Sequence, residues 1–449
     1  MTGKNWYLPA LMAMALMACS QPQQRSEEGG IAHAKSQYAQ DNLSEVSVVH
    51  DPQMDALLQS YIDHNKAPGL AAMVIKDGRV VYANAHGWKD PDNNIPASLD
   101  DYYVLFSQTK AVVTVAFMTL VEQGLVAIDD PVADYFPGIP DTLVTGKDED
   151  GNYLTEKVST PMTFVHLMSH TSGLGARLAG EMRSQNLEGD ARPIGFFGAP
   201  EPDFIPHGQH TGGGDMHAAY LRDEMQALAE YPLGFEPGAD WDYHISTNML
   251  GYLIERISGM PLRQYVKQSV LEPLGMKDTD WYFSADKQNR FIKAYSLVDG
   301  VLEPRPDYYS QGAVSEQQTY AEGAIGLNGP ITDYAKFCLM LLNRGEYNGQ
   351  RILKAETVER MTQINRLPTP NSGGEGFEFG LGFRLFNDNS KPVAAISNSA
   401  YAWGGMMGTE YLIDPQHQMV TLFYLNMYDR EDLYTPFLKQ VYKMIDGAE

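Results

Sequence analysis

The feature that most constrains the fold is an apolar run that directly follows a serine and a lysine. Residues 111–121 read AVVTVAFMTLV, and the pattern stops at Gly124. An apolar run of this length that ends at a glycine predicts a buried helix with a C-terminal cap. Ser107 then falls at the start of the helix, and Lys110 lies on its first turn.

Ser107 and Lys110 are three residues apart, so on a helix the amine can reach the hydroxyl. The helix N-terminus adds partial positive charge and free backbone N–H groups beside that hydroxyl. This layout predicts a serine nucleophile that a lysine activates. The spacing alone is a weak signal, because an N-cap serine beside a solvated lysine gives the same pattern. Ser284 and Lys287 repeat it without a following apolar run, and we interpret Ser284 as a surface turn.

Strand patterns at both ends of the chain enclose a long helical middle. Asp77-Gly78 between two alternating segments is a strong hairpin signal. From about residue 107 to 276 helical patterns dominate, and strand patterns return after about 291. The sequence predicts an α/β fold of the α+β type: an antiparallel sheet flanked by helices, with an inserted all-helical lobe. The expected strands are 69–75, 80–88, 381–386, 394–398, 410–413 and 420–424, and the expected helices include 52–65, 216–229, 247–257, 334–343 and 433–445.

The N-terminus resembles a bacterial lipoprotein signal. Lys4 precedes the apolar stretch 8–18, which ends at Cys19. We expect residues 1–18 to be removed and Cys19 to be lipidated; the alternative is an ordinary secretory signal with an incidental cysteine. Either signal predicts export, to the periplasmic face of a bacterial membrane or otherwise to the periplasm or medium. Residues 19–48 are polar and predict a flexible tether.

Residues 49–449 are the expected catalytic domain, and this length is enough to bury a large core. We predict an α/β lobe from 49–104 and 290–449 and a helical lobe from 105–289. The cleft between two lobes is the default place for an active site, and we expect the loops 176–230 and 366–376 to line it. Cys338 is the only cysteine besides Cys19. We predict that it is a small core residue and that it forms no disulfide within the chain.

The formal net charge of −24 argues against two classes of partner. A strongly acidic chain is repelled by the phosphates of nucleic acids and by anionic membrane surfaces. We therefore expect a small-molecule substrate, no nucleic acid, and membrane attachment through the lipid anchor only. The charge does not indicate an oligomeric state.

Four motifs in a fixed order resemble those of the serine β-lactamase-like superfamily, which includes the penicillin-binding proteins. They are Ser-x-x-Lys at 107–110, His-Thr-Ser-Gly-Leu at 170–174, Trp-x-Tyr at 241–243 leading into 248–251, and Trp-Gly-Gly at 403–405. The resemblance covers roughly residues 50–445. It is greatest to the class C β-lactamase relatives known as family VIII carboxylesterases.

The resemblance implies a role for each matching position. Ser107 looks like the acyl-accepting nucleophile, Lys110 like its activating base, and Tyr243 like the tyrosine that relays protons to the leaving group. The backbone N–H groups of Ser107 and Met406 would form the oxyanion hole. The positions that would contact the substrate are Trp403, Gly404, Gly405 and His244.

Three departures from the family pattern bear on the substrate. His244 stands where serine or alanine is usual, Ile245 stands where lactamases carry an asparagine, and Trp403 replaces a lysine or histidine. They weaken the case for β-lactam turnover and for recognition of a substrate carboxylate. An ester or small amide is favoured. The chemistry also requires burial or a neighbouring charge that lowers the pKa of Lys110, since an ordinary lysine is a poor base at neutral pH.

The sequence thus predicts an exported serine hydrolase that forms a covalent acyl-enzyme on Ser107 and uses no cofactor. The alternative is a penicillin-binding-protein-like D-amino-acid peptidase or a weak β-lactamase. A non-enzymatic binding protein that keeps the fold is a third class, which the intact Ser107, Lys110 and Tyr243 oppose. A catalytic metal is disfavoured, because His166 and His170 lack the glutamate of the zinc-protease pattern. Three further histidines, His207, His210 and His217, gather in a loop.

Overall fold

The computed structural model describes residues 43, 46–175, 178, 182, 220–243, 245–306, 313–314, 320–369 and 372–446. The predicted signal with Cys19, most of the tether, most of the loop 176–230 and His244 lie outside these residues. The predictions made for them stay predictions. Within the described ranges, no helix combines the length and the apolar character that crossing a membrane requires.

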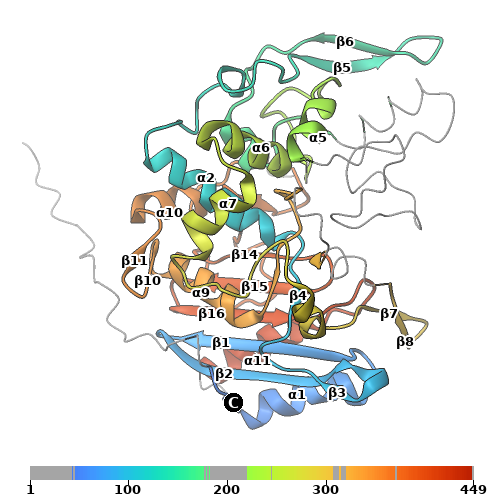
Figure 1. Ribbon diagram of the computed structural model, residues 1–449, viewed down its shortest axis with the longest axis vertical. Helices are drawn as coiled ribbons and strands as arrows, with labels where there is room; N and C mark the ends of the chain where they lie inside the picture. The colour runs from blue at the N-terminus through green and yellow to red at the C-terminus, as the bar shows by residue number, and fades with distance from the viewer. Residues whose placement is uncertain are drawn as a thin grey trace, which may run out of the picture. The chain divides into compact units, whose positions relative to one another are not determined.

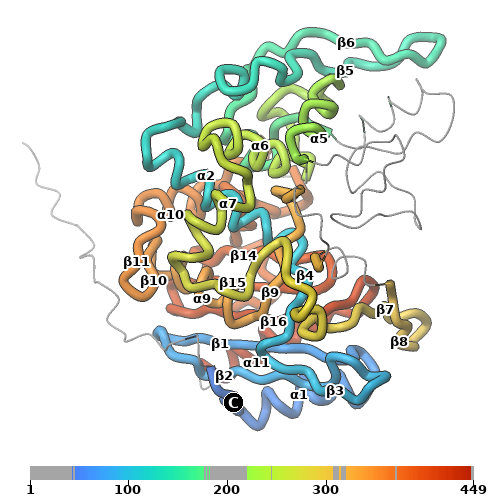
Figure 2. The backbone as a smooth tube through the Cα atoms, viewed as in Figure 1, coloured from blue at the N-terminus to red at the C-terminus, as the bar shows by residue number. Residues whose placement is uncertain are grey.

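A large antiparallel sheet forms the centre of the fold (Figure 1). In the described residues it has eight strands, in the order β12-β13-β14-β15-β16-β1-β2-β3. Strand β1 pairs with β2 on one side and with β16 on the other, so strands from the two ends of the chain lie side by side (Figure 2). The sheet strands are β1 Gly69–Lys76, β2 Arg79–Asp90, β3 Ile95–Pro96, β12 Glu378–Phe379, β13 Arg384–Leu385, β14 Tyr401–Gly404, β15 Thr409–Asp414 and β16 Met419–Tyr424.

Helices cover both faces of this sheet. Helices α1 and α11 pack together on one face, and α9 packs on β15 and β16 from the other. Strand β1 shows why both faces are apolar: Met73 and Ile75 join the core under α9, whereas Ala72 and Val74 join the core under α1 and α11. The helices are α1 Pro52–Asp63, α2 Gln108–Glu122, α3 Phe164–Met168, α5 Leu221–Leu228, α6 Ser246–Ser258, α7 Leu262–Val266, α9 Ile331–Leu342, α10 Ala355–Thr362 and α11 Tyr434–Asp446.

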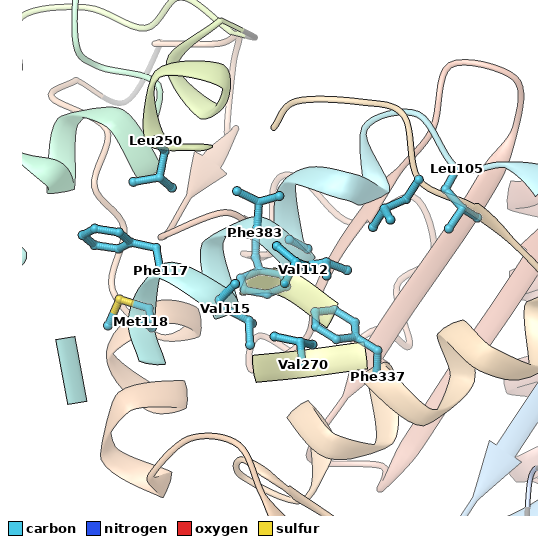
Figure 3. Close-up of a cluster of buried hydrophobic side chains, with 14 of the residues drawn as sticks. Leu105, Val112, Val115, Phe117, Met118, Leu250, Val270, Phe337 and Phe383 are labelled. Atoms are coloured by element: carbon cyan, nitrogen blue, oxygen red, sulfur yellow. The ribbon is translucent and has the colours of Figure 1, made fainter. Parts of the chain in front are cut away.

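Helix α2 is buried, as the apolar run predicts. Every residue from Gln108 to Leu120 is buried, and Gly124 ends the helix with a φ of 73°. Figure 3 shows Val112, Val115 and Phe117 packed among apolar side chains of other elements. Because α2 has no solvated face along these residues, its first turn also lies in the interior. That placement buries Lys110, while Ser107 just before the helix stays half-buried.

The predicted fold class is confirmed, with two local differences. The segment 105–289, predicted to be all-helical, also contains the hairpin of β5 Thr142–Lys147 and β6 Tyr153–Lys157. Its strands are largely exposed, so no apolar alternation marks them. The strand predicted at 394–398 is wrong: the Ser397 hydroxyl donates to Asp414 at 2.6 Å and stabilises a turn there. The remaining short strand pairs are β4 Tyr103–Val104 with β9 Asn328–Gly329, β7 Tyr295–Val298 with β8 Val301–Pro304, and β10 Glu346–Tyr347 with β11 Gln350–Arg351.

Two smaller predictions have different outcomes. Cys338 is fully buried in α9, which confirms it as a core residue. The proposed boundaries of the two lobes stay a prediction.

Candidate active site

The turn before α2 presents Ser107 at the helix N-terminus. The Leu105 amide donates to the Leu327 carbonyl at 3.0 Å, which fixes the chain entering the turn. Phe106 has a φ of 45°, a left-handed conformation that is costly for a bulky residue. Its buried ring packs with Ile325 and other apolar side chains, and this packing holds the strained backbone in place. Strain of this kind is typical of functional sites.

Lys110 contacts Ser107 directly. Its Nζ donates to Ser107 Oγ at 3.1 Å and to the Ala324 carbonyl at 2.9 Å. Burial lowers the pKa of Lys110 to about 7, and the charge of Glu322 opposes that shift. A large fraction of the amine is therefore neutral near pH 7, the state that can accept a proton from serine. Lysine can act as a base on serine near neutral pH only when its pKa is lowered in this way.

Tyr243 completes the group of polar side chains. Its ring lies 4.5 Å from Lys110 Nζ, and its hydroxyl is hydrogen-bonded to Ser107. The Trp403 indole N–H also donates to the Tyr243 hydroxyl, at 2.7 Å. Burial holds the pKa of Tyr243 well above its usual range, so the phenol stays protonated at neutral pH. The hydroxyl can then relay a proton, but the phenolate is not populated at neutral pH and does not serve as the base.

The segment after β14 closes the site from the other side. A Cβ on Gly405 would lie 2.5 Å from the Leu105 carbonyl oxygen and still closer to Thr409 Oγ1. Only glycine allows this approach, which brings Met406 next to the turn that holds Ser107. Among the described residues, no backbone acceptor takes up the N–H of Ser107 or Met406. Both groups can therefore donate to a substrate oxygen.

Substitution of Gly405 by alanine is expected to lower kcat about 10²-fold, the scale of losing one oxyanion donor. The added methyl group would force the end of β14 away from Leu105 and carry the Met406 N–H with it. Steady-state ester hydrolysis measures the effect, with circular dichroism as the test of folding. Gly234→Ala is the matched control, because the nearest backbone atom, the Gly173 oxygen, lies 3.7 Å from the new Cβ. Full activity of the Gly405 variant would contradict the role of this close approach.

Ser107, Tyr243, Gly404, Gly405 and Met406 line one cavity of about 1120 Å³. Trp403 lines it as well, so the predicted substrate-contacting triplet faces the same space as the predicted nucleophile. The structure thus brings these predicted site residues together. His244 lies outside the described residues.

Aromatic rings surround the site, and two of them, Phe377 and Phe379, belong to no motif found in the sequence. His170 is buried with its ring centroid 4.7 Å from that of Tyr243. Burial, and after it the charge of Lys110, hold the pKa of His170 well below its usual range, so the ring is neutral. Phe377 also lines the cavity, directly after the expected loop 366–376. The rings that contact one another here are His170, Trp241, Tyr243, Phe377, Phe379 and Trp403.

The histidines considered as metal ligands have other contacts where the structure describes them. His166 Nδ1 accepts from the Thr163 amide at 3.1 Å, and His170 packs against Tyr243. Within the described part of the chain, no group of three or more His, Cys, Asp or Glu side chains could hold a metal ion. His207, His210 and His217 lie outside that part.

A central antiparallel sheet, helices on both faces and a buried lysine that contacts a half-buried serine and tyrosine define a class of serine hydrolases. The family profile described as Beta-lactamase matches residues 54–436. The chain therefore belongs to the beta-lactamase family and is a serine hydrolase of that family. The family resemblance predicted from the four motifs is confirmed.

Individual relatives are similar over most of the chain. Esterase EstB of Burkholderia gladioli is 26% identical over 381 residues, which cover 81% of this chain and 86% of the esterase. A proposed D-alanyl-D-alanine carboxypeptidase of Escherichia coli strain K12 is 26% identical over 412 residues, or 83% of this chain and 81% of the relative. The solved structure of EstCE1, a hydrolase with promiscuous acyltransferase activity, has a TM-score of 0.68 at 24% identity. That comparison covers 87% of this chain and 97% of EstCE1.

Proposed function

We propose that this protein is an esterase that works through a covalent acyl-enzyme on Ser107. The observation that carries the proposal is the 3.1 Å contact between Ser107 Oγ and a buried amine whose pKa is brought to about 7. The similarity to EstB supports an ester as the substrate. The aromatic surroundings of Tyr243, with Trp403 in place of a basic residue, support a neutral and largely apolar ester.

The site supplies each group that the reaction needs. Ser107 Oγ attacks the ester carbonyl carbon while its proton passes to the neutral amine of Lys110. The N–H groups of Ser107 and Met406 donate to the resulting oxyanion, each contributing about 3–4 kcal/mol in comparable hydrolases. Lys110 returns the proton through Tyr243 to the leaving alkoxide, and the alcohol departs. Water then attacks the acyl-enzyme by the same steps in reverse, which releases the acid and restores Ser107.

A second candidate is a D-amino-acid peptidase or a weak β-lactamase. The similarity to the proposed carboxypeptidase of Escherichia coli favours it, because that relative covers as much of this chain as EstB does. A panel of small esters, a D-alanyl-D-alanine peptide and a chromogenic cephalosporin distinguishes the candidates. We expect ester hydrolysis to be the fastest by kcat/KM. Faster release of D-alanine or faster opening of the cephalosporin would favour the second candidate.

We also propose that the protein is exported and attached to a membrane through Cys19, with no nucleic acid as a partner. The proposal rests on the signal-like residues 1–18 before that cysteine. Expression in a bacterium followed by fractionation tests it. Wild-type protein is expected in the membrane fraction and Cys19→Ser protein outside it. Equal distribution of the two proteins would contradict lipid attachment.

A fluorophosphonate serine probe is the direct test of the proposed chemistry. We expect one adduct by intact-protein mass, located by peptide mapping on the peptide that contains Ser107. The reason is that the probe reacts only with an activated hydroxyl, and Ser107 has the buried amine as its base. A folded sample that forms no adduct would instead favour a non-enzymatic binding protein.

A further inference from the structure

The second contact of Lys110 leads into a buried chain of hydrogen bonds. The carbonyl of Ala324 accepts from Lys110 Nζ, and the amide N–H of Ala324 donates to Asn248 Oδ1 at 2.7 Å. The other end of the same side chain, Asn248 Nδ2, donates to Glu322 Oε1 at 3.1 Å. A single amide on α6 therefore holds both ends of the segment 322–324. Through this segment a buried carboxyl group is connected to the amine that activates Ser107.

Glu322 is paired with a second buried carboxyl group. Glu224, on α5, is 8% exposed, and Glu322 is 6% exposed. Burial, and for Glu322 also the charge of Glu224, raises the pKa of both carboxyl groups well above their usual range. Two neighbouring buried carboxylates do not readily ionise together, so at neutral pH the pair titrates as one unit. With one proton on either group, the pair carries about one negative charge.

The groups that face this pair come from several elements. Lys110 faces Glu322 from α2, and each lowers the energy of the other's charged form. The Tyr320 hydroxyl donates to Glu224, and the Tyr282 hydroxyl donates to the Tyr320 carbonyl. Burial holds the pKa of both tyrosines above their usual range, so neither adds charge at neutral pH. The Trp281 indole donates to the Glu322 carbonyl at 3.0 Å.

We propose that Glu322 is a positioning residue that holds the Ala324 carbonyl against Lys110 and serves as the counter-charge of that amine, with Glu224 limiting its ionisation. The inference rests on the proposed role of Lys110 as the base for Ser107. When Lys110 takes up the serine proton, its positive charge attracts the negative charge of the pair to Glu322, and the proton of the pair moves to Glu224. The ammonium that forms during acylation then has a fixed carboxylate nearby. When Lys110 is neutral, Glu322 is protonated more of the time and carries less negative charge beside the amine.

Two isosteric variants have opposite expected effects on the pH profile. Glu322→Gln removes a carboxylate that stabilises the ammonium, so the pKa of Lys110 falls and activity persists to lower pH. Glu224→Gln removes the neighbour that keeps Glu322 protonated, so Glu322 ionises more fully, the pKa of Lys110 rises and activity is lost at higher pH. We expect shifts of roughly 0.5 to 1 pH unit in each direction. We call the fall of kcat/KM at low pH the acid limb, and its midpoint is the pH at which kcat/KM is half its plateau value. One pH unit below the wild-type midpoint, kcat/KM of each variant relative to its own plateau should then differ from that of the wild type about threefold or more.

The measurement is the pH dependence of kcat/KM together with that of fluorophosphonate labelling at Ser107. Glu255→Gln is the control: this half-buried carboxyl group on α6 also has a pKa raised by burial, but it accepts from the Leu262 amide. Its limb is expected to stay at the wild-type pH. A purely structural role for Glu322 would lower stability or the plateau rate without moving the limb.

Three results separate the possible failures. Limbs that stay within about 0.2 pH unit of wild type in both variants, or that move in the same direction, would overturn the inference while the esterase proposal stands. Wild-type protein that fails to label at Ser107 would overturn the esterase proposal itself. If Glu322→Gln does not fold, the pH profile of Glu224→Gln tests the inference by itself. That variant leaves the hydrogen bonds from Glu322 through Asn248 to Ala324 in place. An unshifted limb in that variant overturns the inference.

Discussion

Substitution of Ser107 by alanine should lower kcat for a small ester by at least about 10³-fold while the protein stays folded. The change removes the oxygen that would form the acyl-enzyme, and neither Lys110 nor Tyr243 can replace it as a nucleophile. The fold should tolerate the change because alanine is smaller and keeps the backbone N–H. Initial rates with a p-nitrophenyl ester and thermal unfolding by circular dichroism measure both effects.

Ser284 provides a control within the same chain, because it has the same Ser-x-x-Lys spacing. It precedes a short 3₁₀ helix of residues 285–290, all of which have exposed or half-exposed side chains. Ser284→Ala should therefore retain wild-type kcat. Near-normal turnover in the Ser107→Ala protein would refute the assignment of the nucleophile, whatever the Ser284 variant does.

Substitution of Lys110 by methionine should also lower kcat at least about 10³-fold, because the serine then has no base within reach. Methionine fills nearly the same volume, so the variant avoids the cavity that alanine would leave in the buried first turn of α2. In the wild-type protein the pKa of Lys110 is lowered to about 7, chiefly by burial. Activity should therefore fall as the pH falls through about 7, since the protonated amine cannot accept the serine proton.

A pH–rate profile of the wild type and of Lys110→Met tests this expectation. The residual activity of the variant should lack the limb near pH 7. Lys287→Met, in the second Ser-x-x-Lys sequence, should keep both the rate and the limb. A wild-type limb that persists unchanged in Lys110→Met would assign the titration to another group and contradict lysine as the base.

Elements whose signal is local in the sequence were predicted well. The start of α2 at Ser107, its end before Gly124 and the β1–β2 hairpin around Asp77-Gly78 follow from backbone preferences and apolar periodicity over a few residues. The turn at 394–398 was missed because a buried carboxylate far along the chain, Asp414, decides it. The hairpin β5–β6 was missed because exposed strands carry no apolar pattern.

The sequence by itself determined the family and the residue types at the site, because motif order and spacing are properties of the chain alone. Only the tertiary structure decided that Lys110 is buried and carries a lowered pKa, since desolvation depends on neighbours from distant elements. It also decided that the Ala324 carbonyl, Glu322 and the ring of His170 surround that lysine. None of these has a local signature, because each reaches the site through long-range packing of helices on the sheet.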